Sequence, residues 1–281
     1  MALDLPVFYK RTGSAVVFAA VMLTGLLWNE WSFYVLICLI NGLCLREYFR
    51  LLQQIDKETY WPKWLPIAIQ ATGILLISLI TAMFSHSISY KHLDILLILA
   101  VTMICLLPAL FFLMSVLPGK NSFVAMLQSV GGILYITLPM LLLMKMEMQN
   151  FILPIAVILM IWTNDTMAYI VGSFMGKTQF SSVSPNKTWE GVIGGVILTI
   201  AGASIYGYIS KTYTLADWMV LALVTTASGT LGDLLESKLK RMADIKDSGT
   251  LMPGHGGALD RFDSLLIAAP FAFVYTFYFM R

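Results

Sequence analysis

Charged and hydroxyl side chains gather near the C-terminus, between two apolar segments. If the first segment continues as a helix, four polar residues spaced 4, 3 and 4 apart share one helix face. These residues are Asp233, Ser237, Lys240 and Asp244, with Arg241 beside them. The pattern predicts a helix face with two carboxylates, a hydroxyl group and two cations, although the solvated end of an amphipathic helix would explain the charges alone.

A glycine-rich loop follows this helix. Its residues are Pro253, Gly254, His255, Gly256 and Gly257. Glycine backbone can turn with positive φ and present N–H groups to an anion. We interpret His255 as a hydrogen-bonding loop residue and not as a zinc ligand. The topology predicted below for a membrane protein places the other two histidines, His86 and His92, on the opposite side of the membrane.

Two carboxylates, Asp260 and Asp263, come directly after the loop and lie one helical turn apart. Acidic residues suit the N-terminus of a helix electrostatically, which is the simplest explanation for them. Two carboxylates on one helix face, beside a glycine loop and several cations, are also what Mg²⁺ needs to bridge phosphate oxygens.

A second polar loop precedes another apolar segment. Its candidate binding residues are Ser184, Asn186, Lys187, Thr188 and Glu190. Lys187 offers a point charge to a phosphate, and the hydroxyl groups offer donors. An interfacial loop with a capping Glu190 would look much the same.

Asp165 lies within an otherwise apolar segment, where a charged side chain costs about 2.5–3.5 kcal/mol on insertion scales. We therefore expect it to face the protein interior with a partner. Its spacing from Tyr169, Gly172 and Gly176 places all four on one helix face, where the glycines permit close approach. The alternative is a helix-packing face with a structural aspartate.

These groups together suit phosphoryl or nucleotidyl transfer, in which positioning and charge neutralisation do most of the work. An attacking phosphate oxygen is already deprotonated at neutral pH and needs no base. At a membrane surface, this chemistry suggests one soluble nucleotide and one lipid substrate.

The composition decides what kind of protein positions these groups. Of 281 residues, 58% are hydrophobic and only 12% charged, which excludes an ordinary soluble domain. The net charge of +2 gives no basic field for nucleic acid, so no nucleic-acid partner is expected. The three cysteines lie inside apolar runs and are interpreted as buried hydrophobes.

Apolar windows long enough to cross a bilayer recur along the chain and predict an all-α polytopic integral membrane protein with about nine transmembrane helices. The expected spans are 14–28, 31–45, 66–86, 93–117, 122–144, 150–173, 191–209, 216–235 and 261–280. The first two are short and form a helical hairpin, and the first is interpreted as an uncleaved span. The charged segment 46–63 is interpreted as a solvated loop.

With nine spans, most Lys and Arg residues fall on the side of the N-terminus, which is therefore predicted to be cytoplasmic. Residues 1–149 are expected to form a scaffold with possible dimer contacts, and 150–281 to carry the catalytic site.

The polar residues near the C-terminus resemble the signature of the phosphatidate cytidylyltransferases, also called CDP-diacylglycerol synthases. The matching positions are Ser237, Lys240, Arg241, Lys246, Asp247, His255, Gly256, Gly257, Asp260, Arg261 and Asp263. The segments 164–177 and 184–191 are also similar to the family. Met252 and Ala258 depart from its usual residues.

The resemblance implies that CTP and phosphatidate react to give CDP-diacylglycerol and pyrophosphate at the cytoplasmic face of the inner membrane. It also implies Mg²⁺ with K⁺, a homodimer, and a metal held by Asp233 and Asp260 with support from Asp263 and Asp165. Catalytic roles fall to Lys240, Arg241, Lys246, Asp247 and Ser237. The polar loop, the residues from Gly254 to Gly257 and Arg261 would bind the substrates.

Two other functions stay open at this point. A CTP-dependent polyprenol kinase would use similar machinery but release CDP instead of pyrophosphate. An ion-coupled transporter would also bury aspartates in helices, but one built on inverted repeats would show related halves.

Overall fold

The computed structural model describes residues 5–84, 122–250 and 256–280 of the chain. Helices account for the regular structure of these residues, and the only extended pairing among them is an isolated bridge between Gln179 and Thr188. The predicted all-α class is therefore confirmed. The predicted span 93–117, and also Gly254 and His255, lie outside the described residues.

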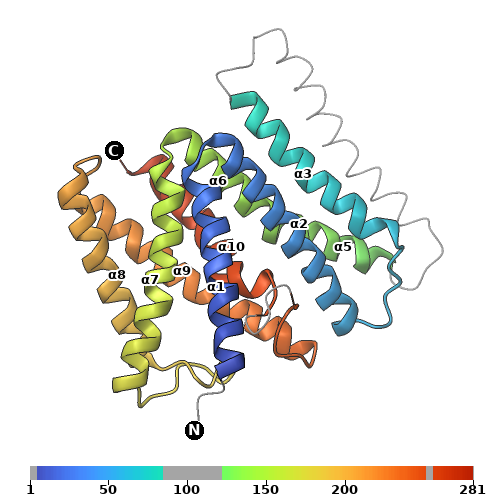
Figure 1. Ribbon diagram of the computed structural model, residues 1–281. Helices are drawn as coiled ribbons and strands as arrows, with labels where there is room; N and C mark the ends of the chain where they lie inside the picture. The colour runs from blue at the N-terminus through green and yellow to red at the C-terminus, as the bar shows by residue number, and fades with distance from the viewer. Residues whose placement is uncertain (1–4, 85–121, 251–255, 281) are drawn as a thin grey trace. The chain divides into compact units, whose positions relative to one another are not determined.

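The chain divides into two compact units, 1–145 with 242–261, and 146–241 with 262–281. The described residues of the first unit form the helices α1 (Leu5–Leu27), α2 (Glu30–Ile55), α3 (Trp64–Phe84), α5 (Ser122–Gly132) and most of α6 (Leu138–Gln149), shown in Figure 1. A short π-helical segment, Ile133–Thr137, joins α5 to α6.

The predicted helical hairpin is present at the start of the first unit. Asn29 begins α2 with a capping box, in which its side chain accepts a hydrogen bond from the Ser32 amide at 2.8 Å. A Cβ at Gly25 would lie 2.7 Å from the Leu36 side chain, so this glycine allows α1 and α2 to approach closely.

The prediction of a solvated loop from residue 46 was wrong for its first ten residues, because α2 continues to Ile55. Apolar side chains keep the helical period there and are buried. These are Tyr48, Phe49, Leu51 and Leu52. The helix therefore also carries Glu47, which lies between two exposed arginines in sequence.

The second unit contains α7 (Ile152–Met175), α8 (Trp189–Ser210), α9 (Leu215–Met242) and α10 (Leu259–Tyr278) from residue 262 onward. Figure 1 shows α7 and α8 side by side. Glycines make this packing possible, since a Cβ at Gly191 would lie 2.7 Å from the Ala168 carbonyl oxygen and one at Gly195 2.8 Å from that of Asn164.

Five of the described helical segments are long and apolar enough to cross a membrane. They are Trp64–Ala82, Phe123–Gln149, Ile152–Met175, Trp189–Ser210 and Leu215–Met242. In α1 the apolar part is shorter, Val16–Leu27, while α2 and α10 carry charged residues at one end. The multi-pass membrane class follows from these segments.

Candidate functional site

The second unit brings α9 and α10 into close contact at Gly232. A Cβ at this position would lie 2.5 Å from the Asp263 carbonyl oxygen and 3.1 Å from the Ser264 Cα. Only glycine permits this approach without a shift of one helix. The contact places Asp233, the next residue on α9, close to Asp263 on α10.

Three carboxylates from three different helices interact in this unit. Asp263 is partly buried, accepts a hydrogen bond from the Ser264 amide at 2.6 Å, and interacts electrostatically with Asp165 on α7 and Asp233 on α9. The positive charge of Lys240 also interacts electrostatically with Asp263, and this interaction is attractive. Like charges this close disfavour one another, so the cluster is suited to attract a cation.

This cluster is not a preformed metal cage. Within the described ranges, no three Asp, Glu, His or Cys side chains lie close enough together to hold a metal ion. Asp165 is itself exposed on α7, whereas its neighbour Asn164 is buried against α8. The expectation that Asp165 faces the interior was therefore wrong, although its interaction with Asp263 keeps it within the cluster.

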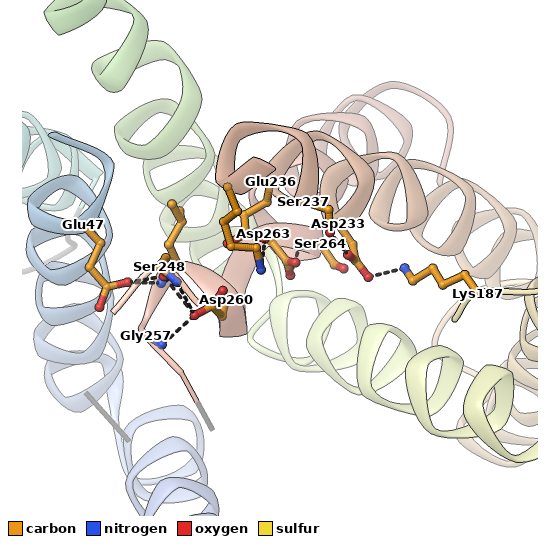
Figure 2. Close-up of polar contacts among 12 residues, drawn as sticks. Glu47, Lys187, Asp233, Glu236, Ser237, Ser248, Gly257, Asp260, Asp263 and Ser264 are labelled. Atoms are coloured by element: carbon orange, nitrogen blue, oxygen red, sulfur yellow. Dashed lines mark hydrogen bonds and ion pairs between the residues drawn. The ribbon is translucent and has the colours of Figure 1, made fainter. Parts of the chain in front are cut away.

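Lys187 in the polar loop forms an ion pair with Asp233 on α9, as Figure 2 shows. Ser237, one turn further along α9, lies 3.2 Å from the other carboxylate oxygen of Asp233 and donates a hydrogen bond to it. The polar loop and α9, which the sequence analysis described as two separate polar clusters, are therefore in contact through this ion pair.

Backbone hydrogen bonds fix the conformation of the polar loop. The Lys187 amide donates to the Ser184 carbonyl at 3.1 Å and closes the predicted turn at Pro185. The Phe180 amide in turn donates to the Lys187 carbonyl at 2.8 Å. The ring of Phe180 packs edge-on against Trp189, with ring centroids 4.6 Å apart.

Two of the predicted binding residues, Thr188 and Glu190, also stabilise the loop backbone. The Thr188 hydroxyl accepts a hydrogen bond from the Gly191 amide at 3.2 Å and caps α8. The Glu190 carboxylate accepts hydrogen bonds from the amides of Lys177 and Thr178. These contacts agree with the alternative given above for this segment, an interfacial loop with capping residues.

Glu236 was missed by sequence reasoning. Its side chain is fully buried on α9 and forms an ion pair with Lys240 at 2.5 Å. The two residues are four positions apart on one helix, and side chains at this spacing are neighbours on the helix surface. This spacing is the sequence pattern from which the ion pair could have been predicted.

The charged stripe on α9 is shorter than predicted. The helix ends at Met242, and Asp244 has a φ of +56° in the following turn. Aspartate tolerates this left-handed conformation better than most residues do, which lets the chain turn away. Asp244 is therefore not part of the helix face, and Arg241, Lys246 and Asp247 are exposed.

The first unit holds a second polar cluster, around the start of α10. Asp260 accepts hydrogen bonds through one carboxylate oxygen from the amides of Ser248 and Gly257, at 2.9 and 2.7 Å. Gly256 has a φ of +84°, and a Cβ there would lie 2.5 Å from the same oxygen. Of the predicted glycine loop, the two glycines within the described residues, Gly256 and Gly257, therefore lie against Asp260.

Glu47 on α2 is the second residue that sequence reasoning missed. Its carboxylate accepts hydrogen bonds from the amides of Ala258 and Leu259, at 3.0 and 2.8 Å. It also accepts one from the Ser248 hydroxyl at 2.8 Å, and Figure 2 shows these two side chains next to each other. The chain separation from Ser248 is 201 residues, so local sequence patterns carry no signal for it.

A family model described as the cytidylyltransferase family matches residues 9–279. The chain belongs to this family. The match covers both units and therefore both polar clusters. It confirms the family that the signature residues between Ser237 and Asp263 indicated.

Curated relatives agree with this assignment. The chain is 43% identical to a phosphatidate cytidylyltransferase of Haemophilus influenzae over 130 residues, which are 44% of this chain and 45% of that protein. It is 44% identical over 115 residues to the Bacillus subtilis protein of the same name, covering 40% of this chain and 43% of that protein. In both comparisons the chain spans less than half the length of the relative.

Proposed function

We propose that this protein is a phosphatidate cytidylyltransferase, which transfers the cytidylyl group of CTP to phosphatidate and releases pyrophosphate. Family membership and the names of the relatives support the activity. The observation that carries it is the cluster in the second unit, where three aspartates interact beside Lys187 and Lys240. Such a set of charges suits the neutralisation and positioning of phosphates.

In the proposed reaction an oxygen of the phosphatidate phosphate attacks the α-phosphorus of CTP. A new phosphorus–oxygen bond forms, the bond to the oxygen that bridges to the β-phosphorus breaks, and pyrophosphate leaves with that electron pair. The attacking oxygen carries no proton at neutral pH, so the site needs no general base. Lys187 exchanges Asp233 for a nucleotide phosphate, and Lys240, Arg241 and Lys246 balance the remaining charge.

The donor set fits a divalent cation, because carboxylate oxygens are ligands that Mg²⁺ prefers. We assign Asp233 and Asp260 to hold it, with support from Asp263 and Asp165, and K⁺ as a second ion. When bound, such a cation withdraws charge from phosphate oxygens. Supporting roles in catalysis and substrate binding are proposed for Ser237, Asp247, Ser184, Asn186, Thr188, Glu190, Arg261 and the residues from Gly254 to Gly257.

The membrane arrangement completes the proposal. Nine spans with a cytoplasmic N-terminus would place the signature residues at the cytoplasmic face of the inner membrane, where CTP is available. Residues 1–149 would act as a scaffold and contribute to a homodimer, and 150–281 would carry most of the catalytic groups.

The test is an assay of the purified full chain in mixed micelles with labelled CTP and phosphatidate. The proposal predicts equal amounts of CDP-diacylglycerol and pyrophosphate, dependent on phosphatidate and abolished by chelation of divalent cations. Release of CDP with a polyprenol acceptor would instead indicate a kinase. The absence of any nucleotide turnover, in protein that elutes as one sharp peak, would contradict the assignment.

A further inference from the structure

Two glycines of the first unit, Gly249 and Gly257, pack closely against the carboxylate of Glu47. A Cβ at Gly249 would lie 2.3 Å from one carboxylate oxygen of Glu47, and a Cβ at Gly257 2.3 Å from the other. Any side chain at either position would displace the carboxylate. The segments that contain these glycines are therefore shaped to admit the carboxylate from α2.

In the part of the chain that the structure describes, Glu47 accepts its hydrogen bonds from backbone and hydroxyl donors of the segments around Asp260. Its two oxygens accept hydrogen bonds from the amides of Leu259, the first residue of α10, and of Ala258, the residue before it. The first amides of a helix have no partner within the helix and need an acceptor. Glu47 supplies that acceptor and fixes where α10 starts.

Ser248 connects Glu47 to Asp260. Its hydroxyl oxygen lies 2.8 Å from the Glu47 carboxylate and 3.0 Å from the Asp260 carboxylate. The hydroxyl carries one proton and can satisfy one of the two at a time. Ser248 is buried, with 3% of its surface exposed, and its own amide also donates to Asp260.

We propose that Glu47 is a positioning residue, which sets the orientation of the Asp260 carboxylate by holding Ser248 and the first turn of α10. The inference rests on the proposed function, in which Asp260 is a metal ligand. Residues that hold metal ligands by hydrogen bonds affect metal affinity or activity by about 10- to 100-fold when they are replaced. Glu47 thus contributes to the proposed site although it lies in the first half of the chain, about 200 residues before the signature in sequence.

The decisive variant is Glu47→Gln, which keeps the size of the side chain. Its NH₂ group replaces an oxygen that now faces backbone N–H donors, so at least one of these loses its acceptor. We expect the Mg²⁺ concentration for half-maximal turnover to rise about 10-fold or more. Glu30→Gln, at the exposed start of the same helix, is the matched control and keeps the wild-type Mg²⁺ dependence.

A second readout does not require turnover. Calorimetric titration of the detergent-purified protein with Mg²⁺ alone is expected to show weaker binding in Glu47→Gln by a similar factor. Ser248→Ala removes only the shared hydroxyl and is expected to shift Mg²⁺ dependence in the same direction by less. In the double variant with Glu47→Gln and Ser248→Ala, the fold-change in Mg²⁺ affinity is expected to be smaller than the product of the two single fold-changes. The reason is that both residues act through Asp260.

A folded Glu47→Gln protein with wild-type Mg²⁺ binding and activation would overturn the inference. If that variant does not fold, wild-type Mg²⁺ binding and activation in Ser248→Ala would overturn it as well. A wild-type protein that makes no CDP-diacylglycerol would instead refute the proposed function, and the Mg²⁺ titration would still decide the role of Glu47.

Discussion

The ammonium group of Lys187 is paired with the carboxylate of Asp233, so a predicted phosphate-binding cation and a predicted metal ligand neutralise each other. The two groups come from a loop and from α9, and both are partly exposed. A nucleotide phosphate and a divalent cation would each replace one member of the pair. The pair therefore keeps both groups close to where the proposed reaction needs them.

Replacing Lys187 by Gln is expected to lower kcat/KM for CTP at least about 10-fold. The reason is that a hydrogen bond to a charged group contributes about 1.5–3 kcal/mol. Lys187→Arg is expected to recover part of the loss, since it restores the charge. Steady-state kinetics with varied CTP will measure this, and Lys177→Gln, an exposed lysine just before the loop, is the control. An unchanged kcat/KM for Lys187→Gln would argue against phosphate binding by this side chain.

Asp260→Asn is expected to abolish formation of CDP-diacylglycerol while the protein stays folded. The amide keeps one oxygen that can accept the hydrogen bonds from the amides of Ser248 and Gly257. It loses the negative charge that a divalent cation requires. Product formation and the thermal melting of the same preparation will be measured together. Near-normal turnover would contradict the metal assignment.

Glu236→Ala is expected to lower the free energy of unfolding by about 3 kcal/mol, because it removes the ion-pair partner of the mostly buried Lys240 ammonium group. The combined change Glu236→Met and Lys240→Met is expected to restore much of the stability, since well-packed apolar residues often replace a buried ion pair without loss. Activity is not expected to return, because Lys240 is assigned to charge neutralisation. Thermal melting in detergent and turnover separate the two effects. Full activity in the double variant would remove Lys240 from the proposed mechanism.

Gly232→Ala tests the contact between α9 and α10. The added methyl group would lie 2.5 Å from the Asp263 carbonyl oxygen, so the two helices must move apart and the carboxylates with them. We expect a lower melting temperature and at least a 10-fold loss of turnover, of the order seen when catalytic groups are displaced. Gly202→Ala on α8, where no described atom outside the local helix backbone and the adjacent residues lies within 4 Å of the new methyl group, is expected to be neutral or stabilising. Equal behaviour of the two variants would mean that the close approach is unimportant.

Much of the architecture could be predicted because hydropathy alone determines where a membrane helix forms. Each predicted span within the described residues contains a helix. The break expected at Asn29 and Glu30 lies at Trp28 and Asn29, because Glu30 already begins α2. Boundaries were less predictable where a helix continues beyond its apolar part. The extension of α2 to Ile55 depends on buried aromatic residues among charged ones, a pattern that span counting does not detect.

The candidate site was predictable in its residue types but not in its pairing. The spacing along α9 correctly placed Ser237 next to Asp233, because helical neighbours follow from sequence. The partners of Lys187 and Glu47 lie on other elements and depend on how the chain folds back. Short-range periodicity contains no information about such long-range contacts.

The hydrogen bonds that close the loop from Phe180 to Lys187 have a thermodynamic consequence for ligand binding. A loop that is already ordered loses little conformational entropy when a ligand arrives, so more of the electrostatic attraction remains as affinity. Substitutions that loosen this loop, such as one that removes the ring contact between Phe180 and Trp189, would weaken nucleotide binding without changing a charged residue.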